Sequence, residues 1–390
     1  MNIARPQNCQ ERAERAALVA ARHAGDVDRD ARFPAEAFEA IRAEGLLSIL
    51  IPRELGGGGY SYGDAAAVCS TLAGACGSTG LIYAMHQIQI ASLLNSSLAS
   101  EWHRALLERI AKQQLLLASA TTEGGIGGDI RSSACAIADH EGQISIQKSG
   151  TVISYARAAD VILATARRAA DAPPSDQVLV CLMKDDCRLS PTSPWNTLGM
   201  RGTVSEGFDL DGRATAAHIC LKPFGEIAAQ SMMPTSHIFW SAVWHGIAAD
   251  AFLKAQSLVR SRARSSPGAT VPGAQRLAMA SARLQLLRAN ILEALAKFQG
   301  ALAEPESADR TSFAIAMSTL KISSGELAIE VIQHALQTCG IAGFRNEGPQ
   351  SLSRHLRDAY SSLVMINNDR IESNVATLLS ASRHDARLIP

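Results

Sequence analysis

Neither sign of charge is in excess in this sequence. Its 390 residues include 37 lysines and arginines and 37 aspartates and glutamates, so the formal net charge at neutral pH is +0. A chain balanced in this way has no overall field that would attract nucleic acid or an anionic membrane. We therefore expect no nucleic-acid partner, and expect any charged substrate to be held by a local group of residues.

Long apolar runs are also missing. No run reaches the roughly 18 apolar residues that a membrane-spanning helix needs. The first ten residues lack the basic start and apolar stretch of a signal peptide. We expect a cytoplasmic protein that does not enter a membrane.

The cysteines lack the spacing of a metal site or a disulfide framework. No Cys-x-x-Cys pair and no accompanying histidine pair occurs among the eight. Reduced, buried thiols are the expected state of such cysteines, so we predict no metal and no structural disulfide. The eight are Cys9, Cys69, Cys76, Cys135, Cys181, Cys187, Cys220 and Cys339.

The composition is that of a globular protein with a large core. Hydrophobic residues make up 47% of the chain and charged residues 19%, and the length exceeds that of a single core, so two or three packed units are expected. Helical patterns before and after a region of short strands predict an α+β fold that is mostly α. We expect an N-terminal helical domain at 1–115, a central small β-barrel or sandwich domain at 116–225, and a C-terminal four-helix-type bundle at 226–390.

The local patterns behind this division differ in period. Pro34 to Glu44 begins with proline and stops before Gly45, as a helix does. Between 116 and 222, short apolar or alternating runs are separated by proline-rich breaks, which is typical of strands. Two later stripes have three- and four-residue steps and predict long packed helices; they are Leu277, Leu284, Leu287, Ile291, Leu295 and Phe298, and Phe313, Met317, Leu320, Leu327 and Val331.

Several glycine-rich and polar segments stand out against this background. Thr121-Thr-Glu-Gly-Gly-Ile-Gly-Gly-Asp129 follows a predicted strand, Val152-Ile-Ser154 lies in the β-region, and Arg357-Asp-Ala359 lies near the C-terminal end. In order and spacing they resemble the acyl-CoA dehydrogenase family of flavoproteins, whose architecture is the predicted one. The resemblance implies a flavin-dependent oxidoreductase with bound FAD.

The same resemblance implies residues for the flavin ring. The family's Thr-Glu-Pro-Gly-Ala-Gly-Ser-Asp loop is matched by Thr121, Thr122, Gly127 and Gly128, where glycine lets the backbone approach the ring. Ser154 keeps the hydroxyl that the family places near flavin N5, while Val152 replaces a tryptophan. Gly128 replaces the loop serine, which leaves the thioester carrier open between coenzyme A and a carrier protein.

Other positions resemble those that hold the adenosine and diphosphate half of FAD from a neighbouring subunit. These are Arg264 and Gln275, with Arg262 as a competing alignment, and then Gln337 and Gly340. A guanidinium fork matches two phosphate oxygens. The resemblance thus implies a homodimer or homotetramer.

The family's catalytic base is where this sequence differs. Counting from Arg357, Ile366 stands at the usual glutamate, and the alternative family position falls near Ser236 and His237. A base is needed because α,β-dehydrogenation of an acyl thioester removes a proton while hydride goes to flavin N5. Asp369 and His237 are the candidate catalytic residues; Asp369 is alternatively an N-cap for the final helix, and His237 a core residue. Glu123 belongs to the flavin loop and is a poor base.

Three functions remain open at this point. The first is dehydrogenation of an acyl thioester, with electrons passing to an electron-transfer partner or oxygen. The second is a flavin-dependent monooxygenase of the same fold, which uses reduced flavin and oxygen and needs no thioester base. Such relatives often carry a histidine several residues after the Arg-Asp segment, and Tyr360 to Arg370 contains none. The third is a non-catalytic homologue.

Overall fold

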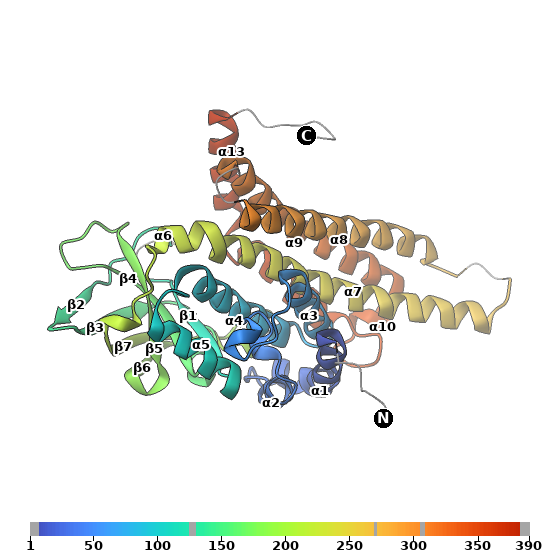
Figure 1. Cartoon of the computed structure of the whole chain (residues 1–390). Helices are drawn as coiled ribbons and strands as arrows, with labels where there is room; N and C mark the ends of the chain where they lie inside the picture. The colour runs from blue at the N-terminus through green and yellow to red at the C-terminus, as the bar shows by residue number, and fades with distance from the viewer. Residues whose placement is uncertain (1–7, 125–129, 269–270, 305–308, 383–390) are drawn as a thin grey trace, which may run out of the picture.

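Helices, strands and then long helices follow one another along the chain (Figure 1). The structure, a computed structural model, describes residues 8–124, 130–268, 271–304 and 309–382. The predicted fold class, α+β and mostly α, is confirmed. The domain boundaries at 115 and 225 stay a prediction.

Five α-helices form the N-terminal part of the described chain. They are α1 (Cys9–Arg29), α2 (Ala35–Ala43), α3 (Tyr62–Ala75), α4 (Gly77–Ser96) and α5 (Glu101–Gln113). The side chain of Ser61 caps α3 by accepting from the backbone of Asp64, whose carboxylate accepts from the Ser61 backbone in return. Helix α4 is buried almost all round, because α3, α7 and β1 pack against different sides of it.

Within the described residues, seven strands form two sheets. One sheet has the order β1-β4-β5 and the other β2-β3-β7-β6. The first sheet is almost completely buried, whereas β3 alternates between buried and exposed residues as a strand with one solvated face does. Leu182 of β5 lies where a β-carbon on Gly212 of β7 would be, so the two sheets approach each other there. The strands are β1 (Leu117–Ala120), β2 (Ile137–His140), β3 (Gln143–Gly150), β4 (Val161–Arg167), β5 (Gln177–Met183), β6 (Cys187–Ser193) and β7 (Gly207–Thr215).

A helical bundle completes the chain. Short helix α6 (Phe224–Ile227) leads through a π-helical turn, Ala228–Met232, into α7 (Met233–Ser265). Helix α9 (Arg310–Cys339) packs against α7, α8 (Ala274–Ala303) and α13 (Asn368–Ala381). Short helices α10 (Ile341–Phe344), α11 (Ser353–Ala359) and α12 (Ser361–Val364) connect α9 to α13.

The bundle core follows the predicted stripes. Leu287, Ile291 and Phe298 of α8 and Leu320 and Val331 of α9 are buried. Helix α7 also packs along α3 and α4, so it joins the bundle to the N-terminal helices. None of the described helices is long and apolar enough to cross a membrane.

Candidate active site

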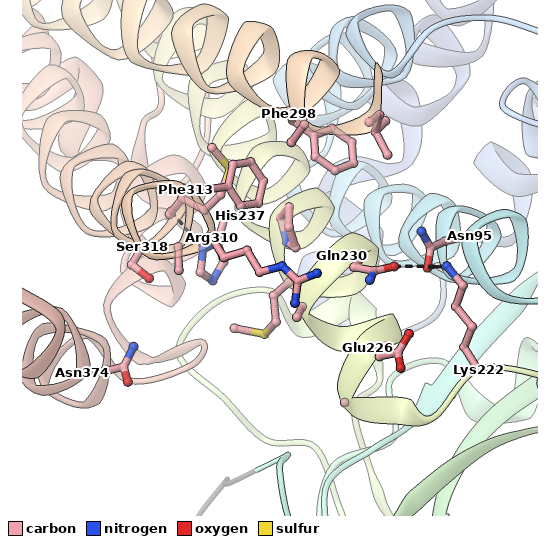
Figure 2. A pocket seen from close by; sticks show the side chains of 18 residues that line it. Asn95, Lys222, Glu226, Gln230, His237, Phe298, Arg310, Phe313, Ser318 and Asn374 are labelled. Atoms are coloured by element: carbon pink, nitrogen blue, oxygen red, sulfur yellow. Dashed lines mark hydrogen bonds between the residues drawn. The ribbon is translucent and has the colours of Figure 1, made fainter. Parts of the chain in front are cut away.

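A cavity of about 710 Å³ lies where the ends of several bundle helices meet (Figure 2). We call it the helix-end cavity. It is bounded by the C-terminal end of α4, by α6 and the π-helical turn, by the start of α7, by the end of α8, by the start of α9 and by α13. Its apolar lining includes Met233, Phe298, Leu302, Phe313 and Met317. Such a space has the size and the mixed lining of a small-molecule site.

His237 is the predicted catalytic residue that the structure brings to this cavity. It lies one turn into α7, is 1% exposed, and its Nδ1 lies 2.9 Å from the carbonyl oxygen of Met317. Because a carbonyl only accepts, Nδ1 carries the proton and Nε2 has a free lone pair. Nε2 has no hydrogen-bond partner among the described residues. Burial lowers the pKa of His237 to about 4, so the ring is neutral at physiological pH and can accept a hydrogen bond at Nε2.

The opposite part of the cavity is polar. The Lys222 ammonium donates to Asn95 Oδ1 at 3.4 Å and to Gln230 Oε1 at 3.1 Å. Figure 2 shows Arg310 reaching from α9 toward Gln230. Glu226 is the one carboxylate among the described lining residues, and its side chain is exposed. No buried carboxylate is therefore present in the described lining.

Lys321 holds the segment around Ile366, the position where the family has its usual glutamate. Its ammonium donates to the carbonyls of Ser362 and Ile366, at 2.9 and 2.8 Å, and to the side chain of Asn368. Burial lowers the pKa of Lys321 to about 8. Ile366 itself has a φ of 45°, in the left-handed region that a β-branched residue avoids. The loop is thus fixed with an apolar side chain at the expected position of the base.

Asp369 lies outside the cavity lining. It is exposed in the first turn of α13, where its backbone N–H donates to Asn367 Oδ1 at 3.1 Å. Asn367 is therefore the N-cap, and the alternative expectation of an Asp369 cap is wrong by two residues. The exposure of Asp369 gives no support to a role as base.

The predicted ring-binding segments meet in the β-region. Thr121 and Thr122 follow β1, and the Thr122 hydroxyl donates to the carbonyl of Val152 at 2.8 Å. The Ser154 hydroxyl lies 2.8 Å from that of Ser205, which lies 2.7 Å from that of Thr203. Val152 is 38% exposed and offers apolar surface beside these hydroxyls. Gly127 and Gly128 lie outside the described residues.

Glu123 has a structural role. Its carboxylate pairs with the ammonium of Lys148, accepts from the Ser133 hydroxyl, and accepts from the Ala134 N–H at 2.7 Å. Burial alone would raise its pKa, but the hydrogen bonds from Lys148 and Ser133 outweigh burial and lower it. A carboxylate held in this way is a poor base, as expected from the sequence.

A second recess lies at the other end of the long helices. We call it the basic recess, and its volume is about 350 Å³. Its lining includes three of the predicted cofactor-binding residues, Gln275, Gln337 and Gly340. It also includes Arg262 and Arg276. Gly340 has a φ of 63°, and open space lies where a β-carbon would be. Neither guanidinium has a hydrogen-bonded or ionic side-chain partner among the described residues. Arg264, the predicted ligand, is exposed and does not line the recess, so the geometry favours Arg262.

The two sites are far apart within one chain. Arg310 in the helix-end cavity and Gln337 in the basic recess lie on the same helix, α9. Twenty-seven residues at 1.5 Å each separate them by about 40 Å, which is longer than one flavin adenine dinucleotide.

Some lining residues were missed from the sequence. Asn95, Lys222, Gln230 and Arg310 come from four separate segments, and none lies in a recognisable motif. Only the packing of α4, the connector before α6, the π-helical turn and α9 brings them together, so no local pattern predicts them.

Comparison with known proteins identifies the family. The sequence model of the acyl-CoA dehydrogenase N-terminal domain matches residues 9–114, and that of the C-terminal domain matches residues 225–365. The chain belongs to the acyl-CoA dehydrogenase family.

Individual relatives differ in the reaction they are named for. The amino sugar nitrososynthase DnmZ of Streptomyces peucetius is 27% identical over 347 residues, which cover 85% of this chain and 82% of that protein. The probable acyl-CoA dehydrogenase YngJ of Bacillus subtilis is 27% identical over 344 residues, covering 86% and 87%. The structure of FMN-bound TdsC from Paenibacillus sp. A11-2 matches with a TM-score of 0.85 at 19% identity, covering 97% and 98%, which shows the common fold.

Proposed function

We propose that this protein is a flavin-dependent oxygenase of the acyl-CoA dehydrogenase family. The observation that carries the proposal is the lining of the helix-end cavity, where no buried carboxylate occurs among the described residues. The family's dehydrogenases remove the proton next to the thioester with a carboxylate of that kind, whereas oxygenation by reduced flavin needs no such base. The similarity to a nitrososynthase over most of both chains supports the same reaction class.

The residues of this chain would bind and orient the substrate. When bound, reduced flavin supplies two electrons, so that one oxygen atom enters the substrate and the other leaves as water. His237 Nε2 would accept a hydrogen bond or proton from a substrate hydroxyl or amine, because its Nδ1–H is already committed to Met317. The apolar lining from Phe298, Phe313 and Met317 would exclude water from the reacting atoms.

The proposed cofactor is FAD. Thr122 and Ser154 offer hydroxyls next to the apolar surface of Val152, which suits the ring. The basic recess offers two free guanidinium groups and an open glycine backbone, which suit a diphosphate. Because the corresponding residues of the family serve a neighbouring subunit's cofactor, we propose that the basic recess serves the flavin of a neighbouring subunit in a homodimer or homotetramer.

Oxygen uptake tests the proposed reaction. The purified protein would be loaded with FAD or with FMN, reduced anaerobically, and mixed with oxygen in the presence of an amino sugar, dibenzothiophene or indole, the compounds named for DnmZ and TdsC. Consumption of oxygen coupled to an oxygenated product, detected by mass spectrometry with ¹⁸O₂, is the expected result. Oxygen consumption that yields only hydrogen peroxide with every substrate would contradict it.

The second candidate is α,β-dehydrogenation of an acyl thioester. It is favoured by His237, which lines the cavity, has no partner for Nε2 among the described residues, and falls in the sequence near the family's alternative base position. Anaerobic addition of butyryl- to palmitoyl-coenzyme A, or of an acyl carrier protein thioester, would then bleach the flavin absorption. Bleaching would select this reaction over oxygenation, and a protein that binds no flavin would favour the non-catalytic homologue.

A further inference from the structure

Three metal-ligating side chains meet away from both sites described above. His103 lies on α5, Cys181 on β5, and Cys220 in the connector between β7 and α6. The ring nitrogen and the two sulfur atoms all lie within 4.8 Å of one another. His103 and Cys181 are fully buried and Cys220 is 3% exposed. This is the one such group among the residues that the structure describes.

Backbone pairing places the two cysteines side by side. Val180 and Ile219 form an antiparallel bridge, and the Cys220 N–H donates to the carbonyl of Leu179 at 2.8 Å. Since side chains alternate between faces, Cys181 and Cys220 project from the same face as diagonal neighbours. Both sulfur atoms therefore point to one spot beneath α5.

The histidine ring is oriented toward the same spot. Ser100 is the N-cap of α5; its hydroxyl accepts from the His103 backbone N–H at 3.4 Å and lies 2.8 Å from the ring Nδ1. When Nδ1–H donates to the Ser100 hydroxyl, Nε2 carries no proton, and its lone pair faces Cys220 Sγ at a distance of 3.8 Å. Metal-bound histidines use their second ring nitrogen in this way.

We propose that His103, Cys181 and Cys220 form a zinc site. Two thiolates and one imidazole suit Zn²⁺, which prefers sulfur and nitrogen ligands in a tetrahedron. Zn–S and Zn–N bonds of about 2.3 and 2.0 Å place ligand atoms about 3.5–3.8 Å apart at tetrahedral angles, close to the separation of Nε2 and Sγ. The +2 ion would cancel the charge of two thiolates, which burial requires.

The site would tie three distant parts of the chain together. It connects the N-terminal helices to the β-sheet and to the connector that enters α6. Lys222, which lines the helix-end cavity, follows Cys220 by two residues. The metal would therefore hold the polar part of that cavity in place and would also stabilise the contact of α5 with β5.

Metal analysis and cobalt substitution test the site. The full-length protein would be purified without chelator from zinc-supplemented cells, and its zinc content measured by mass spectrometry. We expect about one zinc per chain. Replacement by Co²⁺ is expected to give tetrahedral d–d bands and thiolate-to-metal charge transfer. Cys181→Ser and Cys220→Ser are expected to lose the metal, while Cys69→Ser, a buried cysteine elsewhere, keeps it.

Several outcomes would overturn the proposal. Wild-type protein that gives no charge-transfer band on titration with Co²⁺ would by itself contradict the zinc site, even if a variant fails to fold. Equal metal content in wild type, Cys181→Ser and Cys220→Ser would also contradict the zinc site. A Cys181–Cys220 disulfide in freshly purified protein, seen as an intact mass two hydrogens lower, would assign the thiols a different role. None of these measurements depends on flavin or on oxygenation.

Discussion

At the scale of the residue, His237 combines a fixed tautomer with a position in the cavity. His237→Asn keeps a donor for the Met317 carbonyl and removes the Nε2 acceptor, so we expect kcat/KM for product formation to fall about 10²- to 10⁴-fold with little change in stability. Because burial lowers the pKa of His237 to about 4, the wild-type rate should not change with its protonation between pH 6 and 8. His245→Asn, on the same helix outside the cavity, is the control; equal activity of both variants would contradict the assignment.

Also at this scale, the buried pair of Glu123 and Lys148 makes a prediction about stability. Lys148→Met leaves a buried carboxylate without its partner, so we expect the free energy of unfolding to fall by about 3–5 kcal/mol in urea denaturation. Lys297→Met removes the exposed pair with Glu293 and should change little. Similar losses in the two variants would show that burial is not the cause.

At the scale of the element, α11 docks on the β-region through Asp358. Its buried carboxylate accepts from the Met200 N–H at 2.6 Å, and burial raises its pKa to about 6, with Asp28 raising it and Arg354 and Arg357 lowering it. The pKa of Asp358 is higher in the folded protein than its unfolded value near 3.8, so the protonated carboxyl stabilises the fold when the pH is below about 3.8. This stability is lost as the pH rises through about 6.

Asp358→Asn keeps the acceptor and removes the titration. We therefore expect the unfolding free energy of the variant, relative to wild type, to rise by about 2–3 kcal/mol from pH 4 to pH 7. Urea denaturation of both proteins across this range measures the difference. A difference in unfolding free energy that stays constant with pH would show that the pKa of Asp358 is not raised in the folded protein.

At the scale of the whole molecule, the outer face of α8 indicates assembly. Met279 and Leu286 are 45% and 49% exposed and lie seven residues apart, on the same face of the helix, and exposed apolar surface of this kind marks interfaces. We expect the double variant Met279→Lys/Leu286→Lys to have a lower assembled mass by light scattering and to retain less flavin, because the basic recess would no longer reach a partner's site. Leu18→Lys, at a position on α1 that is 63% exposed, should change neither. Wild-type protein that is monomeric would contradict the shared site.

The sequence by itself determined the fold class, the long bundle helices and the family, because these follow from hydrophobic period and from glycine and polar residues at fixed spacing. It also determined that both usual base positions lack a carboxylate. Tertiary packing decided the rest: the position of Arg262 rather than Arg264 in the lining of the basic recess, the burial of His237, the exposure of Asp369, and the meeting of His103 with Cys181 and Cys220. Side-chain exposure and contacts between distant segments depend on how helices and sheets pack, and no local pattern encodes that.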